Sequence, residues 1–103
     1  MGLPNLSDEE RDEALAKAAR IRRDRAQLKK DVKEGTVKVS EVIARAKTDP
    51  VAGRLRVRAL LMSIPGIGES KAQAIMEQVS IAETRRVAGL GKKQAAALIE
   101  RFG

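Results

Sequence analysis

Two short stretches of this chain share one pattern: IPGIGESKAQAI at residues 64–75 and VAGLGKKQAAAL at residues 87–98. When the second stretch is shifted by 23 residues, its apolar, glycine and alanine positions coincide with those of the first. Two copies at this spacing are too few and too short for a solenoid, so the repeated unit is a turn between two helices. The coinciding pairs are Ile64/Val87, Gly66/Gly89, Ile67/Leu90, Gly68/Gly91, Ala72/Ala95 and Ile75/Leu98.

Each turn has the chemistry of a phosphate-binding loop. Glycine permits left-handed backbone angles and close approach, while the apolar residue between the glycines is expected to fill the core. The turn then enters a helix N-terminus, whose unpaired amides and positive dipole end attract phosphate oxygens. A plain interhelical turn is the better interpretation of a single Gly-x-Gly. Two copies with lysines at both helix starts favour phosphate contact, through Pro65, Gly66, Ile67, Gly68, Ser70, Lys71, Gly89, Gly91, Lys92 and Lys93.

The segment between the turns holds Thr84-Arg85-Arg86. Thr84 is expected to cap a short helix running toward Gly89, which leaves the arginine pair exposed. A guanidinium is planar and presents a fork of donors, so Arg85 and Arg86 are the best candidates for contact in a nucleic-acid groove. A solvated arginine pair is the alternative, and the position between two glycine turns favours the binding role.

The N-terminal third predicts one long basic helix over residues 7–34. Ser7 and Glu10 form a capping-box pattern at its start, and Gly35 supplies a stop. Between residues 17 and 33 the chain has eight basic and two acidic side chains. The apolar stripe is thin, with Leu15, Ala18 or Ala19, Leu28 and Val32 as its members. We therefore expect part of this helix to stand clear of the core or to order on a partner.

Residues 40–103 are expected to form a helical core. Ser40 is the predicted N-cap of a short helix, and Asp49-Pro50 marks a helix boundary. Residues 54–58 alternate like a strand, but Val57, Leu60, Leu61 and Ile64 follow helical spacing, so one helix running to Pro65 is predicted. Arg54 and Arg58 on that helix are equally consistent with structural and phosphate-binding roles. Met62, Met76 and Phe102 are expected in the core.

Composition excludes several classes of function. The 103 residues, expected to form a single domain over 1–103, include no Cys, His, Trp or Tyr, and Phe102 is the one aromatic. These absences exclude disulfides, zinc sites with His or Cys ligands, and catalysis by a His or Cys nucleophile. They also leave almost no aromatic side chain on which a nucleic-acid base could stack. We expect no catalytic residues, no metal and no cofactor.

The net charge of +7 predicts a partner that is a nucleic acid, an anionic membrane or an acidic protein. No stretch is apolar enough for a membrane span or a signal peptide, so a cytoplasmic protein is expected.

The combined motifs resemble the integration host factor family of actinobacteria, which is nucleoid-associated and unrelated to the β-armed heterodimer of the same name. The resemblance rests on Leu3-Pro4, Ala18-Ala19-Arg20, Arg25-Ala26, Leu28-Lys29, Arg58-Ala59-Leu60-Leu61, Pro65-x-Ile67-Gly68, Lys71-Ala72, Ile75-Met76, and Thr84-Arg85-Arg86 with Gly89-Leu90-Gly91. It implies an all-α fold in which a long N-terminal helix packs on a helix-two-turns-helix bundle like that of a small-subunit ribosomal protein. It also implies that residues 65–68 and Arg85-Arg86 contact DNA.

The resemblance implies a non-enzymatic protein that binds duplex DNA with little sequence preference, bends or compacts it in the nucleoid, and supports phage site-specific recombination. The expected partner is double-stranded DNA, without a membrane or a small-molecule ligand. The chain is expected to act as a monomer, including in complexes with phage integrase. Ala88 departs from the family, which usually has a basic residue there. Either affinity through this patch is lower, or Lys92 and Lys93 compensate.

Three alternatives stay open from the sequence. A binder of structured RNA or of the ribosome would use the same turn module, because phosphates are common to both nucleic acids. A DNA-repair enzyme with hairpin turns is disfavoured by the short chain and by the acids clustered at residues 8–13. A protein-only adaptor built on the alanine-rich helix would leave the paired turns unexplained.

Overall fold

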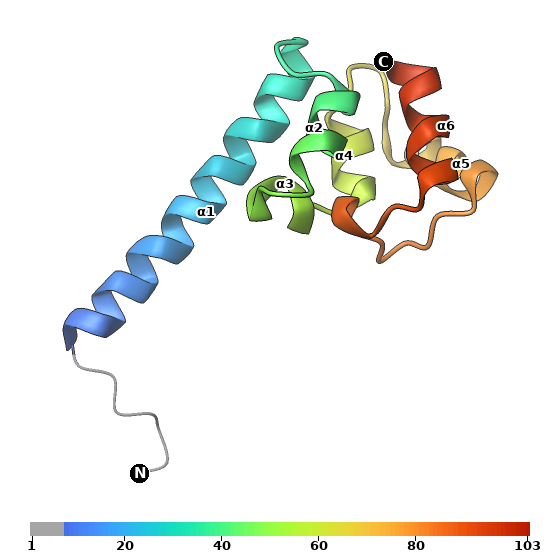
Figure 1. Ribbon diagram of the computed structural model, residues 1–103. Coiled ribbons are helices and arrows are strands. Elements are labelled where there is room, and N and C mark those ends of the chain that lie inside the picture. Colours follow the sequence, from blue (N-terminus) through green and yellow to red (C-terminus); the bar gives the residue numbers. More distant parts are fainter. Residues whose placement is uncertain (1–7) are drawn as a thin grey trace.

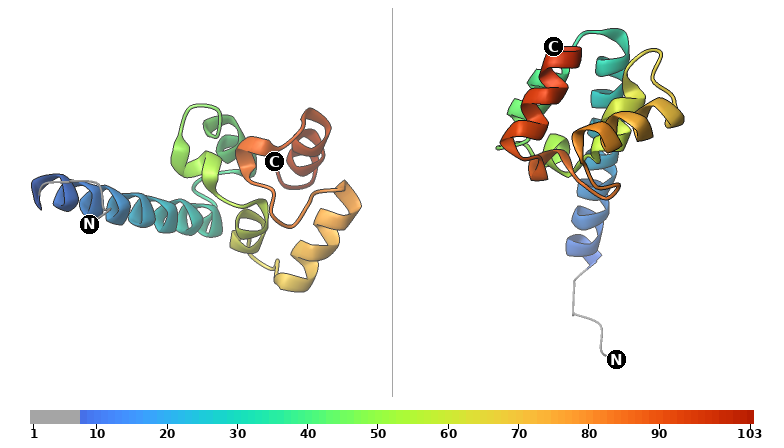
Figure 2. Two further views of the ribbon diagram at one scale, coloured as in Figure 1. Left: turned by 90° about the horizontal axis from the view of Figure 1, so that it is seen from below. Right: turned by 90° about the vertical axis from the view of Figure 1, so that its right-hand side faces the viewer.

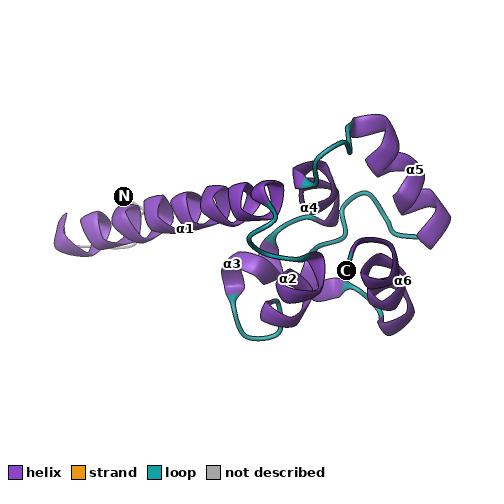
Figure 3. Cartoon of the chain, turned by 90° about the horizontal axis from the view of Figure 1, so that it is seen from above, coloured by secondary structure: helices purple, strands orange, loops and turns teal. Residues whose placement is uncertain are grey.

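The computed structural model describes residues 8–103, which form helices joined by short turns (Figures 1 and 3). Within these residues there is no strand, and extended pairing is limited to one isolated antiparallel bridge between Arg56 and Arg86. The expected all-α fold is confirmed. The elements are α1 (Asp8–Glu34), α2 (Val39–Arg45), α3 (Pro50–Arg54), α4 (Val57–Ser63), α5 (Glu69–Val79), the 3-10 helix η1 (Val87–Gly89) and α6 (Lys92–Phe102).

Helix α1 projects from the rest of the protein (Figures 1 and 2). Its C-terminal half packs on α3 and α4, and Leu28 and Val32 are buried there. Leu15, near the other end, is 64% exposed. Gly35 ends the helix with φ at 80°, as a left-handed residue after the last turn. The expectation that part of this helix stands clear of the core is confirmed, whereas the predicted cap at Ser7 lies outside the described residues.

The core lies among α2, α3, α4, α5 and α6. Its largest fully buried side chains are branched aliphatics and one methionine: Val42, Leu55, Val57, Leu60, Leu61, Met76 and Leu98. Phe102 packs against this cluster from the end of α6, as predicted. The prediction for Met62 is wrong, because this side chain is 45% exposed. Leu60 and Leu61 take the core face of α4, and Met62 lines a surface hollow beside Lys29 and Lys33.

The predicted helix over residues 54–64 is interrupted. Helix α3 begins at Pro50, with Asp49 as its N-cap accepting a hydrogen bond from Val51 N at 2.9 Å, and it ends at Arg54. Leu55 and Arg56 are extended, and α4 begins at Val57. The prediction of one continuous helix is therefore wrong. Backbone pairing with residues 85–87 keeps Leu55 and Arg56 extended, so the helix cannot continue through them. Local periodicity cannot predict this pairing, because the partners are distant in the sequence.

Two predicted caps are also wrong. Helix α2 begins at Val39 with Lys38 as its N-cap, two residues earlier than a Ser40 cap would allow, and Val39 is buried in the core. Thr84 caps no helix. The short helix before Gly89 is the 3-10 turn η1, whose N-cap is Arg86. Among residues 8–103, no helix combines the length and the apolar content needed to cross a bilayer.

Because only the C-terminal half of α1 packs on the core, shortening a side chain should change the free energy of unfolding differently in its two halves. Leu28→Ala should lower the free energy of unfolding by about 2–5 kcal/mol, because it removes a buried side chain. Leu15→Ala makes the same chemical change on the exposed part of the helix and should alter it by less than about 0.5 kcal/mol. Urea unfolding of both variants measures the difference, and equal losses would contradict the packing described here.

Candidate nucleic-acid interface

The first glycine turn joins α4 to α5. Gly66 has φ at +83°, and Ile67 N donates to Ile64 O at 3.1 Å to close the turn. The Ile67 side chain packs against the core, as expected of the residue between the glycines. Gly68 is the N-cap of α5 and has no side chain to offer. The first intrahelical bond runs from Ala72 N to Gly68 O, so the preceding amides of residues 69–71 face outward without a helical partner.

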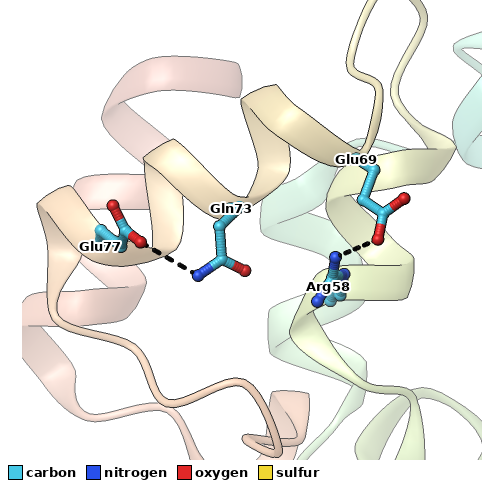
Figure 4. A network of polar contacts seen from close by, with 4 residues as sticks. All are labelled: Arg58, Glu69, Gln73 and Glu77. Atoms are coloured by element: carbon cyan, nitrogen blue, oxygen red, sulfur yellow. Dashed lines mark hydrogen bonds and ion pairs between the residues drawn. The ribbon is translucent and has the colours of Figure 1, made fainter.

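An acidic side chain stands at the mouth of this first turn. Glu69 is the first residue of α5, and its carboxylate accepts a hydrogen bond from Arg58 Nη2 on α4 at 2.7 Å (Figure 4). The carboxylate is 73% exposed. It complements the helix dipole, and it also places negative charge where a phosphate would approach Ser70 and Lys71. Sequence analysis missed this role of Glu69, although its position as the first residue after Gly68 was a usable signal.

The second turn, between η1 and α6, carries the opposite charge. Leu90 packs against the core, and Gly91 is the N-cap of α6. Gly91 N donates to Gln94 Oε1 at 2.9 Å, and Gln94 Nε2 donates to Ser80 O at 2.9 Å. The first turn of α6 contains no acidic residue, and Lys92 and Lys93 are both exposed. This helix end therefore carries the more positive charge of the two.

Arg85 and Arg86 lie directly before η1, and both are exposed as predicted. Their side chains differ in freedom. Arg85 Nη1 donates to Gly89 O at 2.8 Å and so braces the second turn. Arg86 lies opposite Arg56 in the antiparallel bridge, and the hydrogen bonds of the neighbouring residues, Val57 N to Arg85 O and Val87 N to Leu55 O, hold its backbone in place.

The structure does not gather the two turns into one site. Helix α6 crosses the C-terminal end of α5: Gln94 near the start of α6 donates to Ser80 O at 2.9 Å, and Arg101 near its other end donates to Gln78 (Figure 3). The two turns line different hollows, Ile67 of the first turn beside Phe102 and Gly91 of the second beside α2. The second turn is grouped with Arg85 and Arg86, whereas the first turn stands with Ser70 and Lys71.

The residues described here do not form a metal centre. Within 8–103, no three Asp, Glu, His or Cys side chains come close enough to share an ion. The chemistry that the exposed groups offer is instead hydrogen bonding from amides, ammonium groups and guanidinium groups to an anion.

Comparison with known proteins agrees with this arrangement. A family model described as the S13-like H2TH domain matches residues 32–102, and the expected helix-two-turns-helix module is confirmed. The chain is 48% identical over its full length to a protein of Mycobacterium tuberculosis named integration host factor, covering 98% of that protein. The chain belongs to the integration host factor family.

Two further members extend the comparison. An integration host factor of Streptomyces coelicolor is 46% identical over 100% of this chain and 96% of its own length. A solved structure described as sIHF bound to an 8-base-pair palindromic DNA superposes with a TM-score of 0.83 at 44% identity, covering 85% of this chain and 99% of that one. The resemblance drawn from the sequence motifs is confirmed at the level of the family.

Replacing either glycine of the first turn with alanine should change the free energy of unfolding by different amounts. Gly66→Ala should lower the free energy of unfolding by about 1–2 kcal/mol, because its φ of +83° is strained for any residue with a Cβ. Gly68→Ala has open space and an extended backbone, so it should cost less than Gly66→Ala, at most about 1 kcal/mol, the loss coming from alanine being a poorer N-cap than glycine. Thermal denaturation compares the two, and a larger loss at Gly68 would contradict the turn geometry.

Proposed function

We propose that this chain is a non-enzymatic, nucleoid-associated protein that binds duplex DNA with little sequence preference. The observation that carries the proposal is the pair of helix N-termini, at α5 and α6, each entered through a glycine N-cap and flanked by lysines or arginines. Unpaired amides and the positive end of the helix dipole attract phosphate oxygens, so in this proposal the two N-termini hold separate phosphates of one duplex. The 44% identical relative whose structure contains DNA supports the same partner.

The proposed contacts are dominated by the phosphate backbone. Amides of the two turns and nearby cationic side chains hold phosphates, and Arg86 is the side chain best placed to enter a groove. Discrimination between sequences then comes from groove shape and deformability instead of base edges. The proposed DNA-contacting residues are Pro65, Gly66, Ile67, Gly68, Ser70, Lys71, Arg85, Arg86, Gly89, Gly91, Lys92 and Lys93.

Bending and compaction follow in this proposal from a second basic surface. Residues 40–103 would supply the primary DNA-binding core, and the basic segment 17–33 of α1 would draw on the same duplex or a neighbouring one. Such a monomer in the nucleoid would shape DNA for phage integrase during site-specific recombination.

The first test is fluorescence titration of a short DNA duplex and an RNA duplex of matched sequence at several salt concentrations. DNA binding should be tighter and should weaken steeply with salt, with a slope of about 0.9 per phosphate neutralised. Equal or tighter binding of RNA would overturn the DNA proposal and favour a structured-RNA or ribosomal role.

Arg86→Ala should weaken DNA binding and lower the salt slope by about 1, as expected when the bound protein neutralises one phosphate fewer, whether the guanidinium lies in a groove or on the backbone. Lys38→Ala is the matched control. It also removes one exposed charge, but it lies at the start of α2, where Ser40 N bonds to the C-terminal Gly103 O, at the other end of α6 from the second turn. A control that weakens binding as much as Arg86→Ala would show that net charge alone matters.

Glu69→Gln should strengthen DNA binding. The change removes a negative charge from the first turn and releases Arg58 from its ion pair, so both groups become more favourable to a phosphate. Glu77→Gln on the same helix is the control, since Glu77 lies at the other end of α5 and bonds to Gln73 (Figure 4). The same titration measures both variants, and identical affinities would place the first turn outside the DNA contact.

A further inference from the structure

A separate cleft of about 420 Å³ lies between α1 and the core, beside the Arg56–Arg86 bridge. Its charged lining is entirely cationic, with Arg25 and Lys29 from α1, Arg54 and Arg56 from the junction of α3 and α4, and Arg86 from the loop before η1. Leu55 and Ala59 complete it, and no carboxylate takes part. A volume of this size falls within the range of small-ligand sites, about 300–1,000 Å³.

The fold fixes the two contributions from α1. Arg25 and Lys29 are four residues apart, so their side chains share one face of the helix. Leu28 and Val32 anchor the adjoining face in the core and prevent rotation of this half of α1. The two cationic side chains are therefore held at the cleft and do not move freely in solvent.

The fold also forces Arg56 and Arg86 together. Val57 N donates to Arg85 O at 3.0 Å, and Val87 N donates to Leu55 O at 2.9 Å. This pattern makes Arg56 and Arg86 a non-hydrogen-bonded antiparallel pair, in which the two side chains are at their closest. Like charges placed directly opposite each other are destabilising, so an anion between these arginines would relieve a repulsion that the backbone imposes.

These cations have no counter-charge in the described chain. Arg25 Nε is buried and has no hydrogen-bond partner. Ion pairs within residues 8–103 join Arg45 to Glu41 and Arg58 to Glu69, and none involves the cleft. Because a guanidinium cannot lose its proton, a buried donor of this kind favours an acceptor supplied from outside.

We propose that this cleft is a phosphate-binding site, distinct from the glycine turns, which takes successive phosphates of an oligophosphate. Guanidinium forks match phosphate oxygens in geometry, and several cations in one cleft require a ligand with several closely spaced negative charges. Two sources share this chemistry: a free oligophosphate and the phosphodiester backbone of DNA. With DNA as the source the inference rests on the proposed function, whereas with a free oligophosphate it does not.

The test titrates inorganic tripolyphosphate into the full-length protein by calorimetry at constant ionic strength. The variant is Arg25→Gln with Arg56→Gln, and the matched control is Arg11→Gln with Lys38→Gln. Arg11 is exposed on the first half of α1, outside the basic segment 17–33, and neither control residue lines the cleft. Both proteins lose two charges. The cleft variant should bind about tenfold more weakly or worse, because charge-assisted hydrogen bonds are lost, and the control should stay within about twofold of the parent.

Circular dichroism confirms that each variant is folded, and Arg56→Lys separates charge from shape. This change keeps the charge but removes the planar fork, so it should recover only part of the tripolyphosphate affinity that Arg56→Gln loses. Full recovery would contradict recognition by guanidinium forks.

A parallel titration with a short DNA duplex distinguishes the two sources. Loss of tripolyphosphate binding with an unchanged DNA salt slope identifies a free oligophosphate. A lower DNA salt slope in the cleft variant alone, without tripolyphosphate binding, identifies the DNA backbone. The proposal is overturned when the cleft substitutions change neither the tripolyphosphate affinity nor the DNA salt slope. Cleft-dependent tripolyphosphate binding by a chain that binds no DNA would uphold this site and refute the proposed function.

Discussion

Two backbone hydrogen bonds organise the charged surface of this protein. They join Val57 N to Arg85 O and Val87 N to Leu55 O, and so tie the loop before η1 to the junction of α3 and α4. The connection buries Leu55, Val57 and Val87 together and sets the position of the second glycine turn on the core. It also breaks the helix that the sequence pattern would otherwise continue. One short pairing thus interrupts one element and positions the next.

Charge and geometry separate the two glycine turns that look equivalent in sequence. In both turns a glycine is the N-cap of the following helix and an apolar residue packs on the core. The helix after the first turn begins with Glu69, whereas the helix after the second turn begins with two lysines. The Arg58–Glu69 pair neutralises part of the first, while Arg85 stiffens the second through Gly89. Two turns that share a sequence pattern therefore differ in backbone conformation, since only Gly66 has a positive φ, and in electrostatic character, which is set by the first residues of the helix that follows each turn.

Local sequence signals predicted the parts of the fold that local physics controls. The thin stripe of α1 predicted its half-packed state, and the glycine spacing predicted both turns. The break at Leu55–Arg56 could not be predicted in this way, because it depends on the hydrogen bonds that join Val57 to Arg85 and Leu55 to Val87, far apart in the sequence. The strand-like alternation of residues 54–58 was its one local trace. For the same reason, the sequence did not predict the grouping of Arg25, Lys29 and Arg56, because tertiary packing alone brings these residues together.

The half-packed helix α1 consists of two segments of different local stability. Its C-terminal half shares the stability of the core through Leu28 and Val32. The other half has little beyond its own backbone hydrogen bonds, and isolated helices shorter than about 12–15 residues are marginal in water. Amide hydrogen exchange along α1 would therefore follow two opening equilibria, a local fraying and the global unfolding of the chain. One continuous ribbon is, in energetic terms, two cooperative units.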